Sequence, residues 1–132
     1  EGNIFIDKNF ELRKKSLNFL IDELEKNNKS VFLIGPIPTP NYDFASEYSR
    51  QIIFNGNKYK IKKSRKEFED EYKDIINFFV KKLGDNFLQP HKKLCDNTNC
   101  YFADKNGALF SDGNHLSKYG SMKMLPLFKK LD

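Results

Sequence analysis

One short stretch of the sequence combines residue types that can transfer a proton. Asp112 stands three positions before His115, one of the chain's two histidines, with a Gly-Asn pair between them. Across a tight turn, a carboxylate at this spacing can accept a hydrogen bond from the imidazole Nδ1–H. That bond would fix the tautomer, leave Nε2 free as a general base and stabilise the imidazolium. The same spacing fits a simpler alternative, in which Asp112 only closes a turn and His115 precedes a helix.

The residues around this pair resemble a known family. The pattern Asp-x-x-His-Leu-Ser-x-x-Gly at 112–120 resembles the last conserved block of SGNH hydrolases, the GDSL-like esterases and acyltransferases. Val31–Pro38 and the pair Cys95 and Cys100 extend this resemblance. Together they resemble the SGNH domain at the C-terminus of membrane acyltransferases that O-acetylate bacterial surface polysaccharides. The resemblance covers most of the chain, from Phe10 onward.

The resemblance implies a fold and a reaction. The fold would be α/β, a three-layer α/β/α domain with a flavodoxin-like parallel sheet. The reaction would be O-acyl transfer by a Ser-His-Asp mechanism, with Asp112 and His115 as catalytic residues. The family's nucleophile lies in a Gly-Asp-Ser block, which this sequence does not contain, and its oxyanion-hole blocks are not identifiable either. We therefore expect residues 1–132, which begin with Glu rather than Met, to be the C-terminal part of a truncated domain, nearly inactive alone.

The resemblance also implies partners and a location. The partners would be a glycan acceptor, an acyl donor, an upstream transmembrane acyltransferase domain and the missing N-terminal part of the SGNH domain. The acceptor would be lipopolysaccharide O-antigen, capsule or peptidoglycan, on the extracytoplasmic (periplasmic) face of the bacterial inner membrane. The chemistry calls for no cofactor and no metal. Two alternatives stay open: a stand-alone GDSL-type carbohydrate esterase, and a non-catalytic basic module that binds glycan or nucleic acid.

Composition narrows the choice among these classes. A chain of 132 residues with 39% hydrophobic and 31% charged residues is long and apolar enough for one globular domain. No apolar run approaches the roughly 18 residues that span a bilayer, and no signal-peptide pattern opens the chain. The net charge of +5 favours an anionic partner. Because lysines alternate with acidic residues along 66–71, solvated helix faces explain most of them, and we expect no nucleic-acid partner.

The two cysteines of the chain flank a polar loop. A disulfide between Cys95 and Cys100 would close a loop of about six residues, stabilise the fold by about 2 kcal/mol and indicate an oxidising compartment. A zinc site would recruit His91 or His115, but the cysteine spacing is not that of a zinc knuckle and no fourth ligand is evident. Free thiols in a reducing compartment are the other alternative. We predict the disulfide, and we interpret His91, flanked by lysines, as a surface residue.

The elements expected before the Asp-His block alternate as they do in a parallel α/β sheet. The apolar periodicity predicts a helix over Phe10–Asn27 and a strand over Val31–Ile34 that is buried on both faces. A capping box predicts a helix from Ser64 to Gly84, and a second parallel strand follows at Asn86–Gln89. Ligands gather at the carboxyl ends of such strands, so the Gly35–Pro40 loop is either a wall of the site or a structural rim.

The remaining predictions concern shorter elements. Residues 51–54 are expected to form a short edge strand in a polar, aromatic region. A small hairpin of Tyr101–Ala103 and Ala108–Phe110 should lead into the Asp-His turn. Ser117 can cap the final helix, and Gly120 would allow a close backbone approach.

Overall fold

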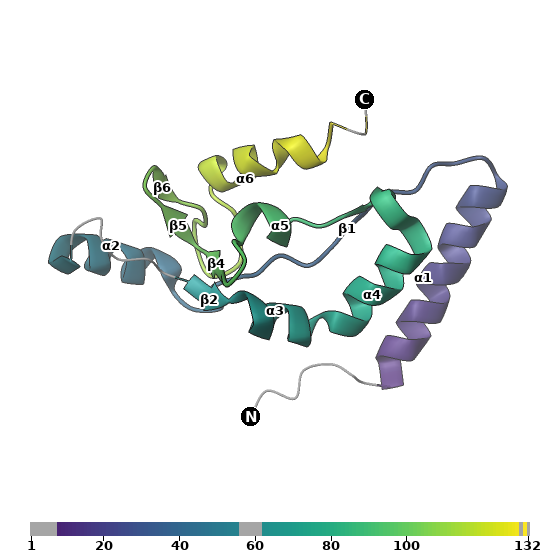
Figure 1. Cartoon of the computed structure of the whole chain (residues 1–132), viewed down its shortest axis with the longest axis horizontal. Coiled ribbons are helices and arrows are strands. Elements are labelled where there is room, and N and C mark those ends of the chain that lie inside the picture. The colour runs from purple at the N-terminus through teal and green to yellow at the C-terminus, as the bar shows by residue number, and fades with distance from the viewer. Residues whose placement is uncertain (1–7, 56–61, 130, 132) are drawn as a thin grey trace.

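The computed structural model describes residues 8–55, 62–129 and 131. The helices are α1 (Lys8–Lys26), α2 (Phe44–Asn55), α3 (Arg65–Glu71), α4 (Lys73–Leu83), α5 (His91–Leu94) and α6 (Lys118–Met124). The strands are β1 (Leu33–Ile34), β2 (Lys62–Ser64), β3 (Phe87–Leu88), β4 (Asn99–Tyr101), β5 (Ala103–Asp104) and β6 (Gly107–Ala108). In Figure 1, α1 and α4 lie together on one side of the molecule and α2 lies on the opposite side.

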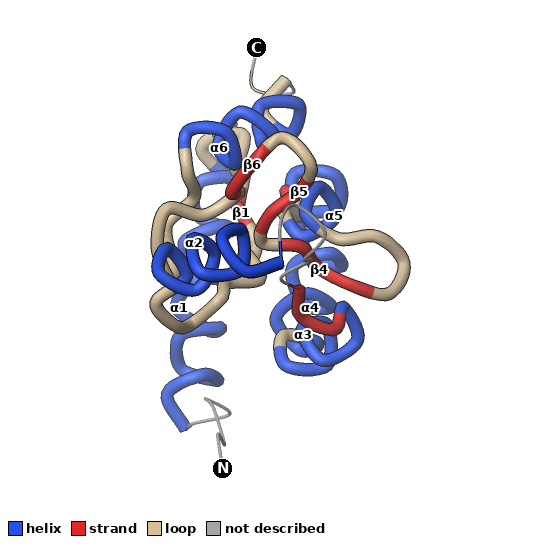
Figure 2. Tube along the Cα trace, turned by 90° about the vertical axis from the view of Figure 1, so that its left-hand side faces the viewer, coloured by secondary structure: helices blue, strands red, loops and turns tan. Residues whose placement is uncertain are grey.

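The strands are short and pair two by two. β1 and β3 are parallel, with Leu33 opposite Phe87 and Ile34 opposite Leu88, which confirms the predicted parallel arrangement. β2 pairs with β4 and β5 with β6, both antiparallel. Figure 2 shows the strands as short red segments among the helices. The described residues therefore form a mixed α/β fold with one small parallel pair, and they do not show the predicted three-layer sheet.

The first strand is shorter and more exposed than predicted. Only Leu33 and Ile34 have strand geometry, and Ile34 is 53% exposed, so the prediction of a strand buried on both faces was wrong. Within the described part of the chain, β3 is the only strand paired with β1. The alternating pattern of a parallel sheet is present, but the neighbours that would bury β1 are not among these elements.

One core cluster holds α1 and α4 against β3. Its buried members are Ile21, Phe79, Leu83 and Phe87. The helix predicted from Ser64 to Gly84 is confirmed at both ends: the Ser64 Oγ accepts the Glu67 N–H at 3.3 Å, and Gly84 ends α4 with φ 54°. Between them Tyr72, with φ −108° and ψ 12°, separates α3 from α4, so the predicted single helix is two.

A second core cluster lies beneath the C-terminal half of the chain. It contains Phe44, Leu94, Phe102, Ala103, Leu109, Phe110 and Met124. Residues 51–54, predicted as an edge strand, belong instead to α2. The helix is favoured because Phe44 and Tyr48, one turn apart, stack with ring centroids 5.5 Å apart and bury one helix face against this cluster. Ile53 and Phe54 then point outward, each 76% exposed.

His91 is buried, which corrects its interpretation as a surface residue. It is 2% exposed, and its ring centroid lies 5.4 Å from that of Phe68. Its Nε2 lies 3.7 Å from the Glu69 Oε1, and its Nδ1 has no hydrogen-bond partner among the described residues. Burial lowers the pKa of the His91 imidazole. The lysines that follow His91 are exposed, but the imidazole itself packs against α3.

Candidate functional site

The Asp-His block forms a closed turn between β6 and α6. Phe110 and Leu116 form an isolated antiparallel bridge at its base. Just inside it, the Ser111 N–H donates to the His115 carbonyl oxygen at 2.9 Å, and the Ser111 hydroxyl reaches the same oxygen at 3.2 Å. The β5–β6 hairpin, confirmed with Asp104 opposite Gly107, leads the chain into this turn as predicted. The backbone of the turn is therefore held before any side chain is considered.

Asp112 contacts both the backbone of the turn and the imidazole. Its Oδ1 accepts the backbone N–H groups of Asn114 at 2.9 Å and of His115 at 2.8 Å. The His115 Nδ1 lies 2.8 Å from Oδ2 and 3.1 Å from Oδ1 of the same carboxylate. The two readings of the sequence thus coincide, because Asp112 closes the turn and also binds the imidazole. With its proton on Nδ1, the ring has Nε2 free to accept a proton.

The imidazole is open to solvent on its unbonded side. The His115 side chain is 74% exposed and that of Asp112 is 52% exposed. A residue of another segment, or a substrate, can therefore approach Nε2 without displacing core side chains. The arrangement can orient an imidazole and take up a proton, which are the base and orienting roles of a nucleophile–base–acid system.

The carboxyl group of Asp112 should titrate in strongly acidic solution. The backbone N–H groups of Asn114 and His115, followed by the His115 imidazole, hold its pKa at about 2, below the ordinary value of 3.8. A lowered folded-state pKa stabilises the fold fully above the unfolded value, and this contribution is lost as the pH falls from about 4 through about 2. A ¹³C NMR titration of the Asp112 carboxyl should give a midpoint near 2. A midpoint at the ordinary value would show that these hydrogen bonds do not persist in solution.

The loop after β1 contacts the Asp-His turn. The Asn41 N–H donates to the Gly113 carbonyl oxygen at 2.9 Å. A Cβ on Gly113 would lie 2.7 Å from the Tyr42 carbonyl oxygen, so the backbones approach closely here. Asn41 directly follows Pro40, so the end of the Gly35–Pro40 loop supports the Asp-His turn. This contact is structural, which is one of the two roles considered for the loop.

The start of α6 fixes the other side of the turn. The Ser117 Oγ accepts the Gly120 N–H at 3.0 Å and donates to the Ala108 carbonyl oxygen at 2.7 Å, while its N–H donates to the Leu109 carbonyl oxygen. Ser117 is therefore the N-cap of α6, as predicted. The predicted close approach at Gly120 is also present, because a Cβ there would lie 2.0 Å from the Leu109 oxygen.

Cys95 and Cys100 form a disulfide, as predicted. Their backbones also form an antiparallel bridge, with the Cα atoms 3.8 Å apart. The bond excludes the zinc and free-thiol alternatives, because neither cysteine keeps a thiolate to bind metal. Among the described residues, no group of three or more His, Cys, Asp or Glu side chains could hold a metal ion. No described helix combines the length and apolarity needed to cross a bilayer.

Removing this disulfide should weaken the fold without abolishing it. The bond closes a loop with a sequence separation of 5, for which chain entropy gives about 2 kcal/mol of unfolding free energy. We expect the Cys95→Ser/Cys100→Ser chain to lose about that amount in urea unfolding. Mass spectrometry should show alkylation of two thiols only after reduction. Alkylation without prior reduction would contradict the disulfide.

Sequence reasoning missed a second structured carboxylate, which lies within the disulfide loop. The Asp96 Oδ1 accepts the backbone N–H groups of Thr98 and Asn99, each at 2.8 Å, and its Oδ2 accepts the Tyr101 hydroxyl at 2.6 Å. These hydrogen bonds, that from Tyr101 foremost, lower the pKa of Asp96 far below its ordinary value. An aspartate followed by Asn-Thr-Asn is a signal for such a turn, so the local part of this structure was predictable.

Comparison with known proteins gives one match. The model of a family described as "SGNH domain (fused to AT3 domains)" matches residues 2–130, a span that includes both members of the Asp-His pair. Comparison with curated proteins and with solved structures finds no match. The family match thus covers nearly the whole chain.

Proposed function

The chain belongs to the SGNH domain family that is fused to AT3 (acyltransferase 3) domains, and on this premise we propose that it carries the catalytic base of an O-acyltransferase. The acceptor proposed is a bacterial surface polysaccharide such as O-antigen, capsule or peptidoglycan. The observation that carries the proposal is the Asp112–His115 pair, with Nδ1 2.8 Å from the carboxylate and the imidazole exposed.

The first half-reaction would form an acyl-enzyme. A serine Oγ attacks the acyl carbonyl of a donor ester, and the His115 Nε2 takes the hydroxyl proton as the C–O bond forms. The imidazolium is stabilised by the carboxylate of Asp112 on its other side. When the tetrahedral intermediate collapses, the bond to the leaving alcohol breaks and Nε2 returns the proton to that alcohol. Asp112 stays ionised throughout, as its low pKa requires.

The second half-reaction would pass the acyl group to the glycan. A sugar hydroxyl attacks the acyl-serine, and the His115 Nε2 takes its proton. Collapse of the second intermediate breaks the bond to serine, which regains the proton from Nε2, and the product is an O-acylated sugar. If water attacks instead of the sugar, the same residues release a carboxylic acid, which is the esterase alternative.

The nucleophile is proposed to come from another part of the same domain, since no Gly-Asp-Ser block occurs in this sequence. Two features support this. β1 has a paired strand on one side only among the described residues, whereas parallel strands are normally buried within a sheet. On α1, Leu12 is 63% exposed, Phe19 67% and Leu20 52%, an apolar surface that a further layer would cover. We propose that the three-layer α/β/α sheet is completed at this edge.

An extracytoplasmic location is proposed on the same grounds. A disulfide is stable in an oxidising compartment, and the family is named for its fusion to AT3 domains. The partners would be the AT3 domain, an acyl donor and the glycan on the periplasmic face of the inner membrane. The Asp-His chemistry needs neither cofactor nor metal, because serine and imidazole carry every bond change and the carboxylate orients the imidazole.

Acetyl transfer to an isolated polysaccharide tests this function. A longer polypeptide that also contains the proposed nucleophile segment would be incubated with p-nitrophenyl acetate and purified O-antigen, capsule or peptidoglycan fragments. We expect the glycan to gain acetyl groups, detected by mass spectrometry, and the His115→Ala variant to transfer none. Release of acetate alone would favour the carbohydrate esterase. No acetyl chemistry, with glycan affinity unchanged by His115→Ala, would overturn both and favour a binding module.

A further inference from the structure

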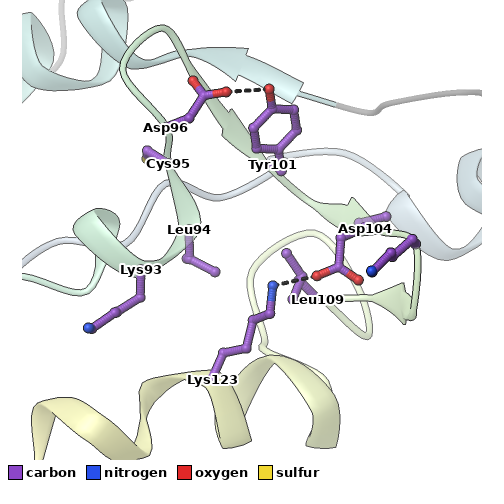
Figure 3. Close-up of a pocket in the computed structure, with 10 residues that line it drawn as sticks. Lys93, Leu94, Cys95, Asp96, Tyr101, Asp104, Leu109 and Lys123 are labelled. Carbon is purple, nitrogen blue, oxygen red and sulfur yellow. Dashed lines mark hydrogen bonds and ion pairs between the residues drawn. The ribbon is translucent and has the colours of Figure 1, made fainter.

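A cavity of about 500 Å³ lies on a part of the domain separate from the Asp-His turn. The disulfide loop, the β5–β6 hairpin and α6 surround it (Figure 3). None of residues 111–116 lines it. Its volume falls in the range of about 300–1,000 Å³ that is usual for small-molecule sites. The proposed acyl transfer does not use this cavity, so the ligand that the cavity could bind has to be inferred from the residues that line it.

The cavity has an apolar floor. Leu94 is 3% exposed and Leu109 is 1% exposed, and both belong to the core cluster beneath the hairpin. In Figure 3 their side chains and the ring of Tyr101 lie around the same space. The Cys95–Cys100 disulfide and the Tyr101–Asp96 hydrogen bond of 2.6 Å fix the wall from which this ring projects. A rigid apolar floor beside an aromatic ring suits the C–H face of a sugar.

The carboxylates of the cavity are already engaged by the protein. Asp104 forms an ion pair with Lys123 and accepts the Tyr119 hydroxyl at 2.9 Å. Burial raises the pKa of Asp104, but hydrogen bonds from Lys123, the Asn106 N–H and Tyr119 outweigh it and lower the pKa overall. Asp96 is held by its own turn. These groups are therefore ionised at neutral pH and can only accept hydrogen bonds, as from sugar hydroxyls.

Two of the three lysines of the lining form no ion pair with a described residue, and the lysines outnumber the aspartates by one. Lys93 and Lys105 line the cavity, and the part of the chain that the structure describes offers neither an ion-pair partner. Lys123 is neutralised by Asp104, and Asp96 offsets at most one of the others. The lining thus carries a net positive charge of three lysines against two aspartates. A ligand that satisfies both the apolar floor and this charge combines a carbon framework with an anionic group.

We propose that this cavity binds a carboxylate-bearing sugar, a hexuronate unit of an acidic glycan, as a subsite that holds the acceptor apart from the reacting hydroxyl. The sugar's C–H face would lie on Leu94, Leu109 and the Tyr101 ring, and its carboxylate would meet the ammonium group of Lys93 or of Lys105. The choice of a glycan rests on the proposed function, since the acceptor there is a polysaccharide. The negative charge of the ligand follows from the lysines of the lining.

Binding can be tested on the 132-residue chain, because it requires no nucleophile. The ¹⁵N-labelled chain would be titrated with trigalacturonate, with neutral maltotriose and with inorganic phosphate. We expect trigalacturonate to shift the amide signals of Leu94, Tyr101 and Leu109 saturably, and each of the other two probes to bind at least tenfold more weakly. Raising the salt concentration should weaken trigalacturonate binding, because rim charges are screened. Equal binding of maltotriose would overturn the anionic assignment, and equal binding of phosphate would overturn the sugar assignment.

Matched variants locate the site. Lys93→Ala/Lys105→Ala should weaken trigalacturonate binding at least tenfold. The control Lys29→Ala/Lys81→Ala removes the same charge from exposed lysines in the α1–α4 half of the chain and should change affinity less than twofold. An equal loss in both pairs would show non-specific attraction and overturn the site. Trigalacturonate binding without acetyl transfer would contradict the proposed function alone, whereas acetyl transfer without such binding would contradict only the subsite.

Discussion

Replacing His115 by alanine is expected to lower kcat/KM of the complete acyltransferase domain by about 10³-fold or more. The substitution removes the proton acceptor for both nucleophiles, the serine and the sugar hydroxyl. Because the His115 side chain is 74% exposed, its loss should leave the unfolding free energy nearly unchanged. The measurement is initial-rate kinetics with p-nitrophenyl acetate, together with urea unfolding of the same variant.

The same turn supplies a matched control for this experiment. Asn114 contributes its backbone N–H to Asp112, and an alanine at this position keeps that N–H. Asn114→Ala should therefore retain most of the activity. Asp112→Ala should lose activity by a large factor, because the imidazole loses its orienting partner. A His115→Ala domain that keeps a tenth or more of the wild-type rate would exclude His115 as the catalytic base.

Gly120→Ala is expected to cause the largest loss of stability from a single methyl group. A Cβ at this position would lie 2.0 Å from the Leu109 oxygen and 2.9 Å from its carbonyl carbon. Both are backbone atoms, so no side-chain rotation can relieve the clash, and α6 must move away from the hairpin. Overpacking of this kind costs about 1–3 kcal/mol and occasionally more. We expect about 3 kcal/mol from urea unfolding.

Ser121→Ala is the control for this substitution, since Ser121 is exposed and its recorded hydrogen bond is made by the backbone N–H. It should change stability by less than about 0.5 kcal/mol. The Gly120→Ala chain should also lose activity in the complete domain, because α6 and its Ser117 cap hold one side of the Asp-His turn. A Gly120→Ala chain as stable as the Ser121→Ala chain would show that this close approach is absent in solution.

The candidate site was predictable because its signals are local. Asp112 lies three residues from His115, and the bonds that join them need nothing beyond the turn itself. The cap at Ser117 is equally local, since the Gly120 N–H that its side chain accepts lies within one helical turn. The disulfide between Cys95 and Cys100 joins positions only five apart. Short-range chemistry of this kind is visible in a single sequence.

The predictions that were wrong concern features that depend on contacts between residues far apart in the sequence. The α2 helix is stabilised by Phe44 packing on Phe102 and Phe110, which lie more than fifty positions later in the chain. His91 was placed on the surface from its lysine neighbours, although it packs on Phe68 across the fold. The cavity beside the disulfide combines α5, the hairpin and α6, so no single stretch of sequence indicates it. For α2 and His91, long-range packing overrides the local sequence pattern.

The most direct test of the central claim is the tautomer of His115, measured by ¹⁵N NMR on the 132-residue chain at a pH where the imidazole is neutral. The Nδ1–Oδ2 distance of 2.8 Å predicts a proton on Nδ1 and a bare Nε2, the form that can act as a base. Asp112→Ala should shift the population toward protonated Nε2, while Asn114→Ala should not. A wild-type chain with its proton mainly on Nε2, unchanged in Asp112→Ala, would contradict the assignment of Asp112 and His115 as orienting carboxylate and base.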